Sequence, residues 1–274
     1  MYDAEVVSTH VHEVLTTFSK DEFPECHTYL FSIIEDDGDV DEEPLTIAET
    51  VMNLDRPKTL PAELISFVEQ MFNLEVGQGN DEAMVNLGGW YYDGGRGFEQ
   101  NFKAAFELYE MASALGNRQA QENLGYCYYY GRVGEPDYEK AFKYFALGAF
   151  DKSLVSLYKI ADMYRVGLYV EKNDHEAFLL YMRCIREMDQ DTEARVAGPV
   201  YLRLAEMFLA GAGCDQDIKA AMVCFQKAEV FLTDMVLAGD VMYKRSLEAA
   251  IEGQDKVRSA VHALLPTGGW GHDD

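Results

Sequence analysis

The sequence predicts an all-α solenoid, in which helical hairpins stack side by side. Three observations lead to this prediction. A five-residue pattern, with a large aliphatic residue first and an aromatic residue last, occurs four times. A second pattern, with alanine first and an aromatic residue last, follows each copy at a nearly constant distance. Glycine-rich turns separate the two patterns, as expected between two helices of a repeated hairpin.

The first pattern marks the first helix of each hairpin. Its aliphatic and aromatic residues are four apart and so share one helix face. The residue after the aliphatic is never larger than alanine, which allows a neighbouring helix to approach closely. A glycine follows three residues after each aromatic residue, where a left-handed conformation ends a helix. The four copies occupy residues 87–91, 124–128, 160–164 and 204–208, and the glycines are Gly94, Gly131, Gly167 and Gly211.

The second pattern marks the second helix of each hairpin. Its alanine and its aromatic residue again form one stripe, with a small residue one turn beyond. The copies begin 18, 17, 17 and 17 residues after the first patterns, which are themselves 37, 36 and 44 residues apart. These copies occupy residues 105–109, 141–145, 177–181 and 221–225. The regular spacing predicts four successive hairpins.

The combined pattern is L-G-x-x-Y-x-x-G, a glycine-rich loop, then A-x-x-x-[YF]-x-x-A. It resembles the Sel1-like repeat, a relative of the tetratricopeptide repeat, over roughly residues 80 to 232. The resemblance implies a right-handed α/α superhelix whose concave groove is lined mainly by the first helices. Leu168 and Tyr169 replace the second loop glycine in the third copy, and eight extra residues within 188–198 precede the fourth.

The flanking segments complete the expected organisation. Residues 1–60 are expected to form an acidic region of helices and loops. Residues 61–232 are expected to form the solenoid, with a helix at 61–75 before the first full hairpin. Residues 233–265 are expected to cap the open end of the apolar core, because the end face of a solenoid would otherwise be exposed. Residues 266–274 are expected to form a flexible tail.

The charge of the chain excludes several classes of partner. Formal net charge is -25, and residues 1–60 hold fifteen Asp or Glu against three Lys or Arg. Such a field repels phosphate backbones and anionic lipid surfaces, so neither nucleic acid nor a membrane is expected as a partner. A basic partner would be attracted. Acids that simply keep the protein soluble explain the same charge.

No metal, cofactor or catalytic motif is expected. Asp37, Asp39 and Asp41 alternate as in a calcium loop, but Glu42 and Ala48 occupy the places where an EF-hand needs glycine and glutamate. The six histidines form no HExxH motif and join no cysteine pair. The five cysteines are scattered without a CxxC motif, and the start of the chain lacks the pattern of a signal peptide. A cytoplasmic location is therefore expected.

The register of the tetratricopeptide repeat selects the residues expected to line the groove. Positions two, five and six after the aliphatic residue, and the position five before it, are expected to point inward. Tyr126, Tyr129 and Tyr130 share one helix face, whereas Tyr128 faces the core. Packing between adjacent repeats explains these tyrosines equally well. The expected contact residues are Glu82, Tyr92, Asp93, Gln119, Tyr126, Tyr129, Tyr130, Asp162, Arg165 and Glu206.

These features predict a non-catalytic scaffold or adaptor that binds a partner protein or peptide, and the charge favours a basic one. One alternative is an acidic immunity protein that neutralises a basic effector. Another is a hydrolase that uses Asp93, Asp162 and Glu206 for acid–base chemistry, although no catalytic motif accompanies them. The sequence leaves the identity of the partner and the oligomeric state open.

Overall fold

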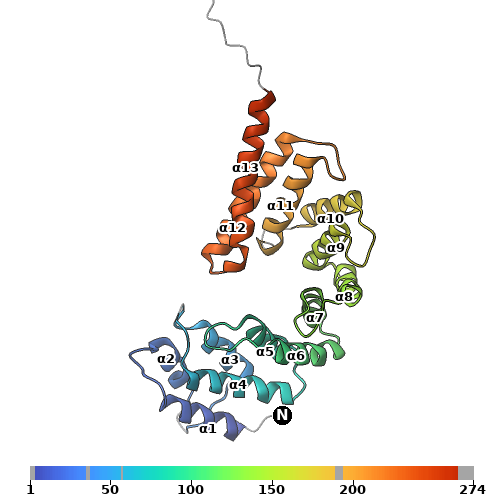
Figure 1. The fold of residues 1–274 in the computed structure, drawn as a ribbon. Coiled ribbons are helices and arrows are strands. Elements are labelled where there is room, and N and C mark those ends of the chain that lie inside the picture. Colours follow the sequence, from blue (N-terminus) through green and yellow to red (C-terminus); the bar gives the residue numbers. More distant parts are fainter. Residues whose placement is uncertain (1–3, 35–37, 57, 189–193, 265–274) are drawn as a thin grey trace, which may run out of the picture. The chain divides into compact units, whose positions relative to one another are not determined.

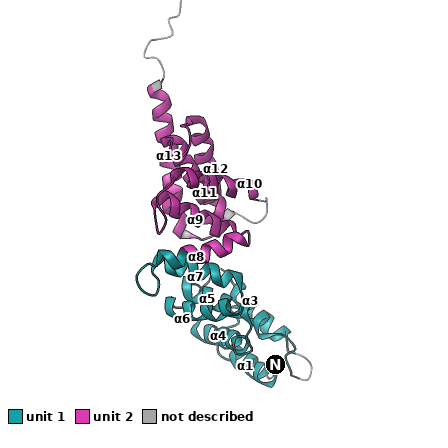
Figure 2. Ribbon diagram, turned by 90° about the vertical axis from the view of Figure 1, so that its right-hand side faces the viewer, with its two compact units in different colours: residues 1–141 teal, residues 142–274 magenta. Residues whose placement is uncertain are grey.

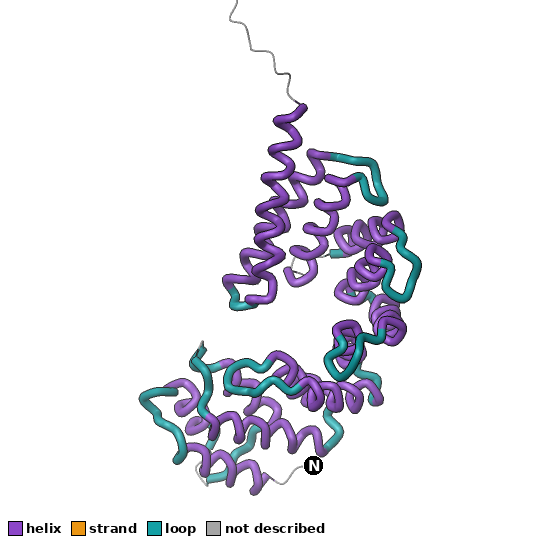
Figure 3. Tube along the Cα trace, in the orientation of Figure 1, coloured by secondary structure: helices purple, strands orange, loops and turns teal. Residues whose placement is uncertain are grey.

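The computed structural model describes residues 4–34, 38–56, 58–188 and 194–264, and helices dominate these residues (Figures 1 and 3). Within them, β-pairing is limited to one isolated bridge between Ile34 and Val40. The predicted all-α fold class is confirmed. The helices are α1 (Ala4–Leu15), α2 (Pro24–Ser32), α3 (Pro44–Asn53), α4 (Ala62–Gly77), α5 (Asp81–Asp93), α6 (Phe102–Ala114), α7 (Arg118–Tyr130), α8 (Tyr138–Phe150), α9 (Leu154–Val166), α10 (Asp174–Glu187), α11 (Ala194–Ala210), α12 (Ile218–Leu237), the 3-10 helix η1 (Val241–Tyr243) and α13 (Lys244–Leu264).

Eight of these helices form the four predicted hairpins. Helices α5, α7, α9 and α11 contain the first pattern and are called A helices, and α6, α8, α10 and α12 contain the second pattern and are called B helices. The small residue after each aliphatic is buried in every A helix. The aromatic residue that ends the second pattern is buried in every B helix as well, and each is at most 2% exposed: Tyr109, Phe145, Tyr181 and Phe225.

Local signals fix where the A helices begin and end. The side chains of Asn80 and Asn117 accept hydrogen bonds from backbone N–H groups at the starts of α5 and α7. At the other ends, Gly94 and Gly131 have φ values of 65° and 61°, a left-handed conformation that costs glycine little. The glycine predicted after each aromatic residue therefore ends the A helix, as expected.

The longer spacing before the fourth copy lengthens an A helix. Helix α11 has 17 residues, whereas α5, α7 and α9 have 13 each. Four of the extra residues thus extend α11 at its start. Residues 189–193 lie outside the described residues.

The chain divides into two compact units, residues 1–141 and 142–274, which Figure 2 shows in different colours. The boundary falls inside α8, within the stretch that the sequence assigns to one solenoid. The first unit has an apolar core built from α1 to α5, and the second has a core built from α9 to α13. Helix α12 continues to Leu237 before η1 and α13 follow. The expected tail, 266–274, lies outside the described residues.

The glycine-rich loop of the first hairpin is tied to the helices that precede the repeats. The Arg96 guanidinium donates to the carbonyl of Leu54 at 2.6 Å and to the carbonyl of Lys58. The Arg96 carbonyl accepts from the N–H of Leu60 at 2.8 Å. Leu54 is the C-cap of α3, where helix carbonyls lack partners within the helix. The loop therefore holds the connection between α3 and α4 in the first unit.

Gly88 provides a test of the packing within a hairpin. A methyl group on Gly88 would lie 2.6 Å from Cε1 of Tyr109, a ring that is only 2% exposed and has no room to move. We expect Gly88→Ala to lower the free energy of unfolding by about 2 kcal/mol, measured by urea denaturation.

The adjacent Gly89 is the matched control, because a methyl group there meets nothing within 4 Å. Gly89→Ala should raise the free energy of unfolding by about 0.5 to 1 kcal/mol, since alanine favours the helix. Equal destabilisation by Gly88→Ala and Gly89→Ala would contradict the packing explanation.

Candidate partner-binding face

The ten residues expected to line a groove fall into two groups, one in each compact unit. Seven lie on α5 and α7 of the first unit, and three lie on α9 and α11 of the second. The tyrosines of the first group and all three residues of the second make contacts within their own unit. The first group is Glu82, Tyr92, Asp93, Gln119, Tyr126, Tyr129 and Tyr130, and the second is Asp162, Arg165 and Glu206.

In the first unit, the A helices α5 and α7 are joined near both ends. Near their starts, the Asn117 amide donates to the Asp81 carboxylate at 2.8 Å. Near their ends, Arg132 follows the C-cap Gly131, and its Nε donates to the Tyr92 hydroxyl at 3.0 Å. The expected contact residues of the first two hairpins therefore lie on neighbouring helices.

Three aromatic rings surround the Arg132 guanidinium. Its central carbon lies 4.7 Å from the ring centre of Phe102, 5.1 Å from that of Tyr130 and 5.4 Å from that of Tyr92. These distances are within the range of attraction between a cation and the face of a ring. Burial raises the pKa of Tyr92, although its hydrogen bond with Arg132 acts in the opposite direction. The phenol of Tyr92 therefore stays neutral and available to accept from Arg132.

The tyrosines of α7 contact one another along the helix. Tyr126 and Tyr130 stack with ring centres 6.1 Å apart and planes 13° apart. Tyr129 meets Tyr130 edge to face at 4.9 Å and meets Tyr138, at the start of α8, at 5.9 Å. Tyr128 packs on a different side, edge to face with Phe106 of α6 at 5.5 Å. We call Tyr126, Tyr129 and Tyr130 the tyrosine face.

The tyrosine face is partly open to solvent. Tyr130 is 45% exposed, whereas Tyr126 and Tyr129 are half-buried. The polar members of the first group are exposed as well: Glu82, Asp93 and Gln119. The first unit thus combines stacked rings with exposed acidic and amide side chains on two neighbouring A helices.

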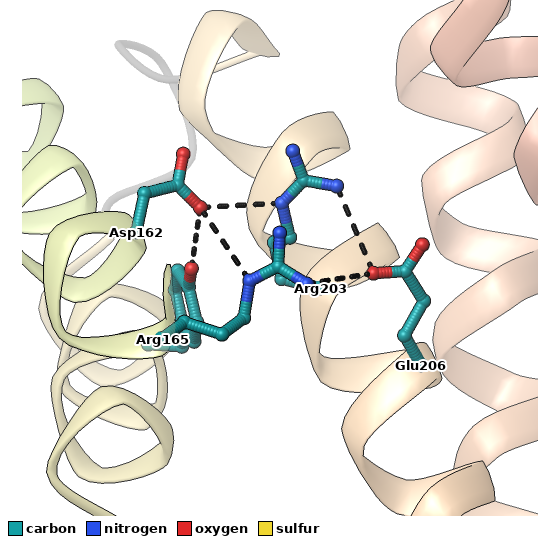
Figure 4. Close-up of polar contacts among 5 residues, drawn as sticks. Asp162, Arg165, Arg203 and Glu206 are labelled. Carbon is teal, nitrogen blue, oxygen red and sulfur yellow. Dashed lines mark hydrogen bonds and ion pairs between the residues drawn. The ribbon is translucent and has the colours of Figure 1, made fainter. Parts of the chain in front are cut away.

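In the second unit, the three expected residues form a cluster of ion pairs with Arg203 (Figure 4). Asp162 Oδ1 lies 3.2 Å from Arg203 Nε and 4.0 Å from Arg165 Nε. Glu206 Oε2 lies 3.4 Å from Arg165 Nη1 and 3.7 Å from Arg203 Nη1. Two arginines and two carboxylates therefore join α9 to α11 and balance each other in charge.

Tyr181 of the B helix α10 adds a buried hydrogen bond to this cluster. Its hydroxyl donates to Asp162 Oδ1 at 2.5 Å. Burial, with the nearby Asp162 carboxylate second, raises the pKa of Tyr181 well above its ordinary value. Burial disfavours the charged form of Arg203, but the carboxylates of Asp162 and Glu206 outweigh this effect and raise its pKa. Arg203 therefore keeps its positive charge across the ordinary pH range.

Sequence reasoning missed five residues of these networks, namely Phe102, Arg132, Tyr138, Tyr181 and Arg203. Arg132 is the first residue after the glycine that ends α7, and Arg203 directly precedes the aliphatic residue of the fourth copy. Both are cations in an acidic chain, close in sequence to the expected contact positions. Their position beside the expected contact residues is the signal that could have marked them.

Other kinds of site receive no support in the described residues. A shallow hollow of about 380 Å³ lies between α1 and α4, beside His10 and Phe67, and none of the ten expected residues lines it. Across the described residues, no group of three or more His, Cys, Asp or Glu side chains is placed to hold a metal ion. None of the helices found there combines the length and the apolar character that a membrane crossing requires.

The paired A and B helices, with left-handed glycines at the ends of the A helices, define an α-helical repeat protein of the solenoid class. The family model described as the Sel1 repeat matches four segments of the chain, and together these extend from residue 81 to residue 229. The chain therefore belongs to the Sel1 repeat family, which confirms the resemblance drawn from its motifs. The matched segments are residues 81–117, 118–149, 154–181 and 199–229.

Two solved structures share this fold. A Sel1 repeat protein from Oxalobacter formigenes is 18% identical with a TM-score of 0.50, and the match covers 70% of this chain and 78% of that one. A protective antigen of uropathogenic Escherichia coli that displays an SLR fold is 17% identical with a TM-score of 0.56. That match covers 90% of this chain and 53% of the antigen, so this chain spans about half the antigen's length. Among curated protein sequences, none matches this chain.

Arg132 offers a test of how the first unit holds its aromatic rings. Arg132→Ala removes the contacts with three rings and the hydrogen bond to Tyr92, so we expect the free energy of unfolding to fall by about 2 kcal/mol. Urea denaturation measures the change, and aromatic proton shifts of Tyr130 report its altered packing. Lys20→Ala is the charge-matched control, because Lys20 is an exposed cation of the same unit. An equal loss in both variants would assign the effect to net charge instead.

Tyr181 gives a test of the second cluster that depends on pH. Tyr181→Phe removes a buried hydrogen bond to a carboxylate and should cost about 2 kcal/mol of unfolding free energy at pH 7. Because the pKa of Tyr181 is raised in the folded protein, the folded state keeps this proton when the unfolded chain loses it near pH 10. The stability that Tyr181 contributes therefore declines above about pH 10. Urea denaturation at several pH values should show the gap between wild type and variant narrowing there, and a constant gap would contradict this account.

Proposed function

We propose that the chain is a protein-interaction module that holds a partner protein or peptide against the A helices α5 and α7. Sel1 repeats are typical of protein-interaction scaffolds. The observation that carries the proposal is the tyrosine face, whose rings are ordered by mutual contacts while Tyr130 remains 45% exposed. Rings that are already ordered lose little conformational freedom when a partner covers them.

The energetics of interfaces favour this face as an anchor. Tyrosine contributes a large ring area and a hydroxyl, and it is enriched among the residues that dominate binding energy. The exposed acids Glu82 and Asp93 on the neighbouring α5 would then select a partner by charge complementarity and accelerate its approach. Affinity would come from the rings and selectivity from the acids.

The proposed role is to bind a partner without catalysing a reaction. The carboxylates of Asp162 and Glu206, which a hydrolase would use for acid–base catalysis, instead hold Arg165 and Arg203. Asp93 lies in the other compact unit. This arrangement supports the partner-holding role over the hydrolase alternative.

The state of the thiols supports a reducing, cytoplasmic setting for this partner. All five cysteines are free, and four of them are buried. Burial raises the pKa of Cys26 and of Cys127 to about 12, which keeps both as unreactive thiols. Scattered free thiols of this kind are typical of proteins in reducing compartments.

The tyrosine face is tested by removing two of its rings. The double variant Tyr129→Ala, Tyr130→Ala should capture its partner from a lysate of the native host about tenfold less than wild type does, quantified by mass spectrometry. The control is Leu147→Ala with Phe150→Ala, which removes two exposed apolar side chains, 52% and 87% exposed, from the B helix α8. Thermal unfolding establishes that each variant is folded. Equal capture by both double variants would refute the proposal.

A further inference from the structure

The net charge of the chain is concentrated in the first compact unit. Residues 1–141 contain 28 Asp or Glu and 8 Lys or Arg, which leaves a formal charge of -20. Residues 142–274 contain 20 acids and 15 cations, which leaves -5. The two units are similar in length, so a charged partner meets a much more negative electrostatic potential at the first unit than at the second.

Several cations of the first unit do not offset its carboxylates through ion pairs. Arg96 donates to backbone carbonyls, and Arg132 is held by aromatic rings. The Lys58 ammonium donates to the carbonyl of Glu22 and lies over the ring of Phe23 at 5.5 Å. These side chains stabilise the fold and leave much of the unit's negative charge facing solvent.

Corresponding positions of the A helices are used differently in the two units. The second position after the aliphatic residue is Tyr126 in the second hairpin, Asp162 in the third and Glu206 in the fourth. In the second unit both acids are neutralised by Arg165 and Arg203. In the first unit the position is Gly89 in the first hairpin and carries a ring of the tyrosine face in the second. The ion-pair cluster thus leaves little uncompensated charge for a partner.

The Arg132 site shows what the rings of the first unit can hold. Three rings from α5, α6 and α7 lie within 5.4 Å of one guanidinium carbon. Two electrostatic effects attract arginine and lysine side chains to aromatic faces in an acidic unit. One is the ring quadrupole, and the other is the surrounding negative charge. The chain therefore already binds one cation of its own by the chemistry that a basic partner would use.

We propose that the partner presents a segment rich in arginine and lysine, and that the A-helix face of the first unit alone holds it. The contact residues are the tyrosine face with Glu82, Asp93 and Gln119. Asp162, Arg165 and Glu206 serve as a structural join between the third and fourth hairpins and do not touch the partner. This inference rests on the proposed function and adds to it the chemistry of the partner and the part of the chain that binds.

A random peptide library displayed on phage, selected against the full chain, tests the chemistry of the partner. Enriched peptides are expected to be rich in Arg and Lys. When such a peptide carries a photo-cross-linker, it should attach to residues 1–141 and not to 142–274. Enrichment of acidic or apolar peptides, or attachment to the second unit, would overturn this inference while leaving a partner-binding role intact. Failure of every peptide to enrich would count against both proposals.

Matched charge variants separate the specific face from general attraction. Glu82→Gln with Asp93→Asn and Glu107→Gln with Glu110→Gln remove the same charge from the same unit, but the second pair lies on the B helix α6. The first pair should weaken binding of the best enriched basic peptide about fivefold, and the second by less than about twofold. The difference should shrink in about 0.5 M NaCl, where exposed charges are screened. Equal weakening by the two pairs would show non-specific attraction and refute the assigned face.

Discussion

The close approach of each A helix to its B helix is the constraint on which the rest of the structure depends. A residue no larger than alanine in the A helix and a buried aromatic ring in the B helix recur in all four hairpins. Gly88 and Tyr109 show the geometry, since there is no room for even a methyl group between them. Because this packing buries one face of each helix, the remaining faces contact the next hairpin or solvent. Function, in a protein of this class, must be carried by those remaining sides.

The two units use those remaining sides in different ways. In the first, α5 and α7 are joined by Arg132 and carry stacked rings with exposed acids. In the second, α9 and α11 are joined by two arginines and two carboxylates. A partly buried ion-pair cluster adds little net stability, because the charges lose hydration as they gain each other. Rings that remain partly exposed keep the capacity to bury more area against a partner, so the first unit is the better candidate for binding.

Much of the fold was predictable from the sequence because its signals are local. Glycine at the end of each A helix and an aromatic residue four after an aliphatic act within one or two helical turns. The contacts made by Arg132 and Arg203 were not predicted, since each joins residues about one repeat apart. Arg132 bonds Tyr92 across 40 residues, and Arg203 bonds Asp162 across 41. The tyrosine face was predicted as a shared helix face, but the stacking of Tyr126 on Tyr130 and the contact of Tyr129 with Tyr138 depend on rotamers that spacing does not define.

The cluster in the second unit has a further physical consequence at the place where the repeat spacing is broken. The third and fourth copies of the first pattern begin 44 residues apart, compared with 37 and 36 residues between the earlier copies. Chain length alone therefore does not set how α11 lies on α9. An apolar contact tolerates a slide of one turn, because it has no direction. A slide here would separate Arg203 from the buried Asp162 carboxylate and Glu206 from Arg165, and an unpaired buried charge costs several times what the paired cluster contributes. The ion pairs therefore select one register for the fourth hairpin, and this selection, rather than added stability, accounts for charged residues at a helix interface.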